Sequence, residues 1–398
     1  MESYWFDWLS LMLRWLHVVA AIAWIGESFY FVMLDNGLTP PTDQDSRDRN
    51  VHGEMWSVHG GGFYHAQKYL VSPPALPKSL HWSFWKAYTT WLSGFALFTA
   101  VYLFKADTYL VDKQVFDLSP PQAVHGALGF LIAGWLVYDG LCRLLGKHER
   151  LLGAAVAVWV IAATYAATHL FAGRAAYLLV GAMLATKMSA NVFFWIIPGQ
   201  RKTVACLRSG EAPNPIWGKN GKQRSVHNTY FTLPVVFAMI SNHYPGTYGH
   251  PHSWLLLLGM MAAGALIRLF FVAMHGGRMV YWLPTAAVAI IGGVMALAVP
   301  PADEFDDKAL SHVAVPSYAA VRTVLSQRCA ACHTAAPSQY GYVAPPAGLV
   351  MDNEVVVRAN VERIRTALKT RYMPLANLTK MTDDERKLLL RWISAGAP

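Results

Sequence analysis

Long apolar stretches recur along the first 300 residues of the chain, separated by shorter polar segments. Each stretch is close to the roughly 20 residues that an α-helix needs to cross a bilayer. The pattern therefore predicts about eight transmembrane helices, at about 9–34, 86–104, 123–145, 151–171, 175–197, 229–242, 253–274 and 279–299. The sixth is short and contains Pro234, which predicts a broken helix that lines a cavity.

The pattern changes after residue 300. Residues 301–315 predict an exposed linker, because they carry the acidic side chains Asp303, Glu304, Asp306 and Asp307. Residues 316–398 then show two amphipathic helix patterns, the second of which follows a capping box at Thr382–Glu385. We therefore predict an all-α chain, with a polytopic membrane bundle at 1–300, the linker at 301–315 and a small helical domain at 316–398.

The composition supports the membrane assignment. Hydrophobic residues make up 54% of the chain and charged residues 14%, whereas soluble domains average roughly 45–50% and about 25%. The net charge of +9 does not indicate a nucleic-acid-binding protein, because the basic residues are scattered along the sequence and form no patch interleaved with aromatic residues. Most of them fall in loops on one side of the predicted membrane. This bias predicts that the N-terminus lies outside the cytoplasm.

Cys329, Cys332 and His333 form a C-x-x-C-H motif. This is the spacing at which two thiols attach a haem covalently and the adjacent imidazole binds its iron. Met373, which precedes a proline about forty residues later, is the candidate second axial ligand. The alternatives are a structural disulfide for the two cysteines and a packing role for the methionine.

Residues 316–398 resemble a class I cytochrome c domain. The resemblance implies a covalent haem c whose iron is bound by His333 and Met373. Because such haems are attached outside the cytoplasm, it also implies a bacterial inner-membrane protein with this domain on the periplasmic side. The expected partners are membrane lipid and a downstream cytochrome c or terminal oxidase that accepts electrons.

Ionisable residues at membrane depth are costly and are therefore functional candidates. They are Arg14, His17, Glu27, Asp139, Lys187 and Arg268. The segment from Leu16 to Gly26 resembles the first helix of membrane protoporphyrinogen oxidases. That resemblance implies a haem b on His17, for which His125 and His169 are the first partners to consider. Alternatively, each histidine is an interhelical hydrogen-bonding group, and Glu27 or Asp139 pairs with Lys187 or Arg268.

Two further segments carry a resemblance that spans most of the chain. One reads H-G-G-G-F-Y-H from His59 to His65, and the other runs from Asn191 to Lys202 at the end of a predicted helix. With the membrane helices and the C-terminal haem motif, they resemble the bacterial membrane-bound urate oxidases (urate hydroxylases) of purine degradation. Lys187 departs from expectation, because an apolar residue is expected at its position.

The resemblance implies that urate is oxidised to 5-hydroxyisourate with water as the oxygen source. Electrons would pass to the fused haem and the respiratory chain without forming hydrogen peroxide. Urate is a planar anion, so its site needs cations or backbone donors, an aromatic slot and a base. The candidate catalytic residues on the cytoplasmic side are His59, Tyr64, His65 and Asn191, with either histidine as the base.

A cytoplasmic site would lie a membrane thickness away from an external haem, so it would require a second cofactor. Without such a cofactor, the urate site must lie near the outer face, close to Arg174 or His243. Two other functions remain open. The first is a quinol-linked respiratory cytochrome subunit with no purine substrate, and the second is a membrane sensor or transporter with a redox-gated domain.

Overall fold

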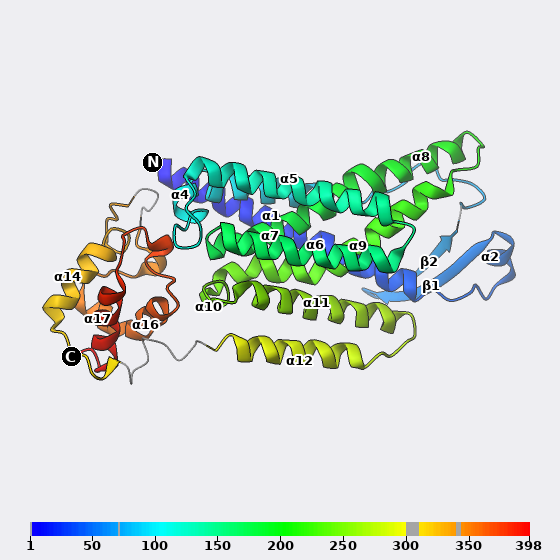
Figure 1. Ribbon diagram of the computed structural model, residues 1–398. Helices are drawn as coiled ribbons and strands as arrows, with labels where there is room; N and C mark the ends of the chain where they lie inside the picture. Colours follow the sequence, from blue (N-terminus) through cyan, green and yellow to red (C-terminus); the bar gives the residue numbers. More distant parts are fainter. Residues whose placement is uncertain (1, 71, 300–309, 340–343) are drawn as a thin grey trace.

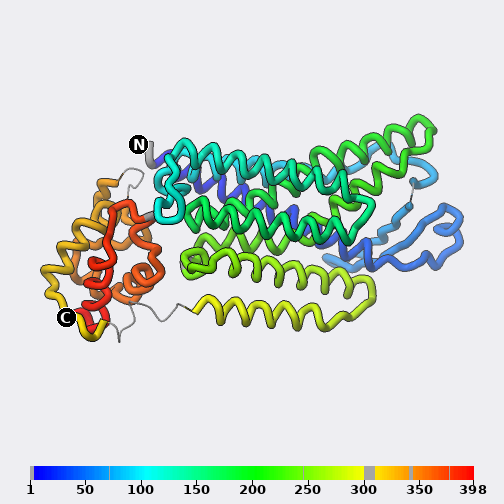
Figure 2. Tube along the Cα trace, viewed as in Figure 1, coloured from blue at the N-terminus to red at the C-terminus, as the bar shows by residue number. Residues whose placement is uncertain are grey.

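The computed structural model describes residues 2–70, 72–299, 310–339 and 344–398. The described chain is mostly helical. Its long helices lie side by side in one bundle, and a small helical domain lies at one end of this bundle (Figures 1 and 2). We call that end the domain end and the opposite end the hairpin end. Most of the predicted acidic linker falls outside the described residues.

Within the described residues, five helical spans are long and apolar enough to cross a membrane. They contain α1 (Glu2–Asn36), α5 (Pro120–Leu145), α6 (Glu149–Leu170), the continuous run α7 (Gly173–Asn191), η2 (Val192–Ile196) and α8 (Ile197–Arg208), and α11 (Ser253–His275). These spans correspond to five of the eight predicted helices. They indicate a membrane protein.

The other three predicted spans are also helical, with different lengths. Helix α3 (Trp85–Phe98) continues into the π-helical turn η1 (Thr99–Leu103), and α12 (Trp282–Leu297) is apolar but has only 16 residues. Helix α9 (Pro215–Ile240) begins well before the predicted span and continues through Pro234. The predicted break is therefore wrong. The chain leaves regular α-helix only afterwards, at the 3-10 turn η3 (Ser241–His243).

Helix α7 lies at the centre of the bundle. Most of its residues are buried, and it packs against α5, α6 and α9. Close packing depends on small side chains: a Cβ added to Gly181 would lie 2.9 Å from the Cβ of Ala238 on α9. Small residues allow the backbones of membrane helices to approach in this way.

The prediction of an all-α chain is wrong for one segment. Strands β1 (Val51–His59) and β2 (Gly62–Tyr69) form an antiparallel hairpin at the hairpin end (Figure 1). Gly60 and Gly61 connect the strands, and both have positive φ (58° and 81°). Two-residue hairpin turns commonly require this conformation, which glycine adopts without steric cost. The glycine run therefore makes a tight turn.

The C-terminal domain has its own apolar core. Its helices are α14 (Tyr318–Arg328), α15 (Glu354–Ala359), α16 (Val361–Lys369) and α17 (Asp383–Ser394). The predicted capping box at Thr382 and Glu385 is present at the start of α17. Arg328 on α14 donates hydrogen bonds to both carboxylate oxygens of Glu385 at 2.9 to 3.0 Å. One carboxylate thus joins the first and last helices of the domain.

Replacing Glu385 with Ala should lower the free energy of unfolding of this domain by about 1 to 2 kcal/mol at pH 7, because charge-assisted hydrogen bonds and the cap are lost. The hydrogen bond from Arg328 holds the pKa of Glu385 below its ordinary 4.5. The stabilisation should therefore be present above pH 4.5 and disappear as the pH falls through the lowered pKa. Hydrogen exchange of the α17 amides would measure it.

Asp384 provides the matched control, because it is exposed in the same first helical turn. Asp384→Ala removes only a favourable interaction with the helix dipole, of about 0.5 kcal/mol. Equal losses in the two variants would show that the contact with Arg328 contributes nothing.

Candidate functional site

A cavity of about 350 Å³ lies in the bundle towards the domain end, and we call it the domain-end cavity. Its wall is formed by α1, α3, η1, α5, α7, the end of α9 and the 3-10 turn η3. The polar and aromatic residues that line it are Arg14, His17, Trp24, Thr90, Trp91, Phe95, Phe98, Tyr102, Arg174, Thr186, Asn242 and His243. Its volume lies at the lower end of the range for small-molecule sites.

The domain-end cavity combines positive charge with a flat aromatic wall. Arg14 and Arg174 provide two guanidinium groups. The rings of Trp91 and Phe95 are stacked, with centroids 5.3 Å apart and planes inclined by 11°. Trp91 is fixed by a hydrogen bond of 3.1 Å from its Nε1 to Thr186 Oγ1. These features suit a planar anion.

Three polar atoms on residues of this cavity are buried without a hydrogen bond of good geometry among the described residues, although the Arg174 guanidinium lies near the Tyr102 hydroxyl. They are Arg174 Nε, the Tyr102 hydroxyl and Asn242 Oδ1. Buried polar groups normally have partners, because leaving one unsatisfied costs about 1–3 kcal/mol. A bound ligand or water that both donates and accepts hydrogen bonds would satisfy all three.

His17 is held in one orientation beside the cavity. Its Nδ1 lies 2.9 Å from the carbonyl oxygen of Thr90. A carbonyl only accepts, so Nδ1 carries the proton and Nε2 has a free lone pair. Gly94 allows this arrangement, because a Cβ there would lie 2.7 Å from His17 Cε1. His17 can therefore accept a proton or bind a metal through Nε2.

The predicted partners of His17 lie elsewhere. His125 Nδ1 contacts the Pro121 carbonyl at 2.8 Å, and His169 Nδ1 contacts the Tyr165 carbonyl at 2.7 Å, each within its own helix. Neither residue lines the domain-end cavity, whereas His243 does. The geometry therefore gives no support to a haem shared by His17 with His125 or His169.

The structure separates the predicted catalytic residues. His59 and Tyr64 are exposed on the hairpin. His65 lies 2.8 Å from Glu54 through Nε2 and stacks on Trp56, with ring centroids 4.1 Å apart. These contacts hold the two strands together, and none of the three residues lines either of the two cavities described here.

Asn191 instead belongs to a buried polar network within the bundle. It donates to Asn228 Oδ1 at 2.8 Å and to the Tyr138 hydroxyl at 3.2 Å, and its Oδ1 accepts from Arg224. Arg224 also pairs with Asp139 at 2.7 Å. Both Nδ2 and Oδ1 of Asn191 therefore bond to other protein groups, which favours a structural role for this residue.

The alternative prediction that Glu27 or Asp139 pairs with Lys187 or Arg268 is wrong. Glu27 pairs with Lys86 at 3.0 Å, and Asp139 pairs with Arg224 and Arg143. Lys187 is fully buried, with Nζ 3.9 Å from the centroid of the Phe231 ring and 4.7 Å from that of Tyr138. The structure describes no hydrogen-bond partner for it. It faces the protein interior and lines neither cavity.

The C-x-x-C-H motif forms a turn directly after α14, where the His333 amide donates to the Cys329 carbonyl at 2.9 Å. Cys329 and Cys332 are free thiols, so they do not form the alternative disulfide. The buried His333 Nδ1 lies 3.0 Å from the Leu349 carbonyl, which leaves Nε2 free for a metal. These donors fit a covalently attached haem. Among the described residues, no three His, Cys, Asp or Glu side chains cluster as a metal site.

The segment that carries Met373 contacts the bundle beside the domain-end cavity. Tyr372 packs against the apolar core of the bundle, and its ring lies 6.2 Å from that of Tyr248. On the bundle side, Arg174 lies over the Tyr109 ring at 5.6 Å, and the Tyr109 and Tyr102 rings are 5.4 Å apart. Aromatic side chains thus extend from the cavity wall towards the C-terminal domain.

Comparison with known proteins decides the family. Residues 3–299 match the family described as Urate oxidase N-terminal. The chain belongs to this family. No curated protein and no solved structure matches the chain. The family suggests an oxidoreductase that acts on urate, and the match includes every residue of the domain-end cavity but not the C-x-x-C-H segment.

The buried network of Asn191, Arg224 and Asp139 should contribute to the stability of this member of the urate oxidase family. Arg224→Gln should lower the free energy of unfolding by about 3 kcal/mol or more, because Asp139 loses its buried partner. Arg143→Gln removes the exposed partner of the same carboxylate and should cost less than about 1 kcal/mol. Thermal unfolding of the purified protein in detergent compares them. Similar small losses would mean that burial does not strengthen the Arg224 pair.

Proposed function

We propose that this chain oxidises urate to 5-hydroxyisourate in the domain-end cavity, with water as the oxygen source, and passes the electrons to its C-terminal domain. The observation that carries this proposal is the position of the cavity. It offers two arginines and unsatisfied polar atoms to a planar anion, and it lies next to the aromatic contact with the segment of Met373.

The cavity can recognise urate through its charge, shape and hydrogen-bonding groups. Arg174 and Arg14 would bind the anionic purine, and guanidinium groups suit planar oxygen-rich ligands. The rings of Trp91 and Phe95 would cover its face. Asn242 Oδ1 can accept from a ring N–H, while the Tyr102 hydroxyl can donate to a carbonyl oxygen.

The proposed reaction balances in atoms and in charge. The urate monoanion and one water give 5-hydroxyisourate, one proton and two electrons. A new C–O bond joins the water oxygen to C5 of the purine. His17 Nε2 accepts a proton from the attacking water, since its Nδ1 proton is held by Thr90. Water supplies the oxygen, so the reaction forms no hydrogen peroxide.

The two electrons leave towards the C-terminal domain. Cys329, Cys332, His333 and Met373 would hold a haem c there, and this group would accept electrons one at a time. Tyr248 of the bundle contacts Tyr372, which precedes Met373 in the C-terminal domain. A downstream cytochrome c or terminal oxidase would be the final acceptor, with the domain on the periplasmic side of a bacterial inner membrane. This route passes through the contact between the bundle and the C-terminal domain, so it includes no haem b in the bundle.

The first test is to add urate to the purified full-length protein without oxygen or quinol. The absorbance of reduced c-type haem should appear, with two electrons delivered per urate consumed. Reduction by quinol but not by urate would contradict the proposal and favour the respiratory cytochrome subunit.

Arg174→Gln should weaken urate binding by about tenfold to hundredfold, because a charge-assisted hydrogen bond contributes about 1.5–3 kcal/mol. Lys113→Gln is the control, because Lys113 is an exposed cation that pairs with Asp117 at 3.2 Å and does not line the cavity. Equilibrium dialysis with labelled urate measures both variants. Unchanged binding in Arg174→Gln would place the urate site elsewhere.

A further inference from the structure

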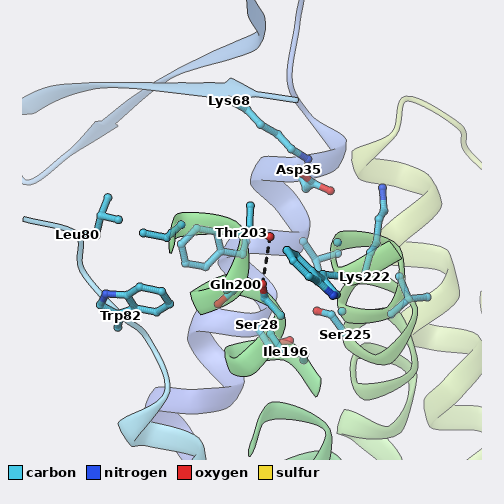
Figure 3. A pocket seen from close by; sticks show the side chains of 18 of the residues that line it. Ser28, Asp35, Lys68, Leu80, Trp82, Ile196, Gln200, Thr203, Lys222 and Ser225 are labelled. Atoms are coloured by element: carbon cyan, nitrogen blue, oxygen red, sulfur yellow. Dashed lines mark hydrogen bonds and ion pairs between the residues drawn. The ribbon is translucent and has the colours of Figure 1, made fainter. Parts of the chain in front are cut away.

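A second, larger cavity of about 960 Å³ lies at the hairpin end. We call it the hairpin-end cavity. Figure 3 shows its side chains coming from the end of α1, from β2, from the loop before α3, and from α8 and α9. Its charged, amide and aromatic residues are Phe31, Asp35, Asn36, Lys68, His81, Trp82, Gln200, Trp217, Lys222 and Tyr230. The function proposed above assigns it no role.

The hairpin-end cavity also carries positive charge beside aromatic rings. Lys68 forms an ion pair with Asp35 at its edge (Figure 3). Lys222 on α9 is close enough for its charge to lower the pKa of Lys68, although burial lowers that pKa more. Trp82 and Trp217 provide flat apolar surfaces, and Gln200 can both donate and accept hydrogen bonds. Among the described residues that line this cavity, Lys222 is therefore the cation that can face an anion, because Lys68 is already paired with Asp35.

A small apolar cluster lies between the two cavities. Its buried members are Ala87, Val192 and Ile197, and Trp24, Trp82, Phe84, Tyr88 and Ile196 pack against them. Trp24 also lines the domain-end cavity, whereas Trp82 and Ile196 also line the hairpin-end cavity. One cluster of side chains thus touches both cavities. We call it the dividing cluster.

The backbone at the dividing cluster is irregular. The π-helical turn η2 (Val192–Ile196) interrupts the run from α7 to α8 at this level. Such turns inside α-helices are rare and are frequent at functional sites. The irregular backbone thus lies in the cluster whose side chains line both cavities.

We propose that the hairpin-end cavity is a second binding site for a planar organic anion, and that urate passes from it through the dividing cluster to the domain-end cavity. This inference rests on the proposed function, because it concerns the route of the same substrate. Lys222 and Gln200 bind the anion while Trp82 covers its ring. The chain then both conducts urate along the bundle and oxidises it.

Binding stoichiometry tests the second site without turnover. Full-length protein kept reduced with ascorbate under anaerobic conditions is dialysed against labelled urate. Two urates should bind per chain. Lys222→Gln should weaken one site about tenfold and leave the other, whereas Arg174→Gln should weaken only the other. Lys219→Gln is the matched control, because Lys219 lies one helical turn earlier on α9 and is exposed like Lys222 but does not line the cavity.

The outcomes separate the two proposals. A single urate per chain, lost in Arg174→Gln and kept in Lys222→Gln, overturns the second site and leaves the proposed function intact. A single urate lost only in Lys222→Gln contradicts the domain-end site and with it the proposed function. Equal effects of Lys222→Gln and Lys219→Gln would also overturn the second site.

The proposed passage of urate from the hairpin-end cavity to the domain-end cavity is tested by supplying urate on one side of the membrane at a time. The protein is inserted in one orientation into vesicles, and urate is supplied only on the hairpin side. We expect haem reduction, slowed about tenfold in Lys222→Gln at low urate and not in Lys219→Gln. Reduction by urate supplied only on the domain side, with none from the hairpin side, would overturn the passage.

Discussion

Arg174, in the first turn of the central helix α7, carries a positive charge that needs compensation within the bundle. The structure describes no ion pair between Arg174 and a carboxylate, and its Nε has no hydrogen-bond partner among the described residues. Charged groups at membrane depth are costly unless they are compensated. An anionic ligand in the domain-end cavity would compensate both Arg174 and Arg14. A ligand in that position would lie beside the aromatic contact with the C-terminal domain, so the proposed binding and electron transfer would share one location.

Much of the fold follows from the sequence, because apolar length and helix capping are local properties. Five spans and the capping box at Thr382 and Glu385 were predictable in this way. The hairpin was missed because its histidines and aromatics suggest a ligand loop, although two adjacent glycines at Gly60 and Gly61 are a hairpin signal. The length of α9 was also missed, because its first half is polar and lies outside any hydropathy window.

The domain-end cavity was less predictable, because its residues come together only through helix packing. Arg174 and His243 were candidates only if no membrane cofactor exists, and both line the domain-end cavity. Tyr102, Trp91 and Asn242 carried no sequence signal, since isolated aromatic and amide residues are common in helices. Asn191 was selected because of its motif, yet its amide is used within the buried network of Asp139 and Arg224. Sequence motifs therefore identified the family, whereas the residues that form the domain-end cavity are set by helix packing.

A cryo-electron microscopy map of the reduced full-length protein with urate would locate the bound purine. If urate binds in the domain-end cavity, the map should show planar density between Arg174 and the Trp91 ring, with Tyr102 and Asn242 within hydrogen-bonding distance. Urate bound at the hairpin beside His59 and His65, with the domain-end cavity empty, would contradict this binding site. That result would also restore the need for a cofactor that relays electrons along the bundle.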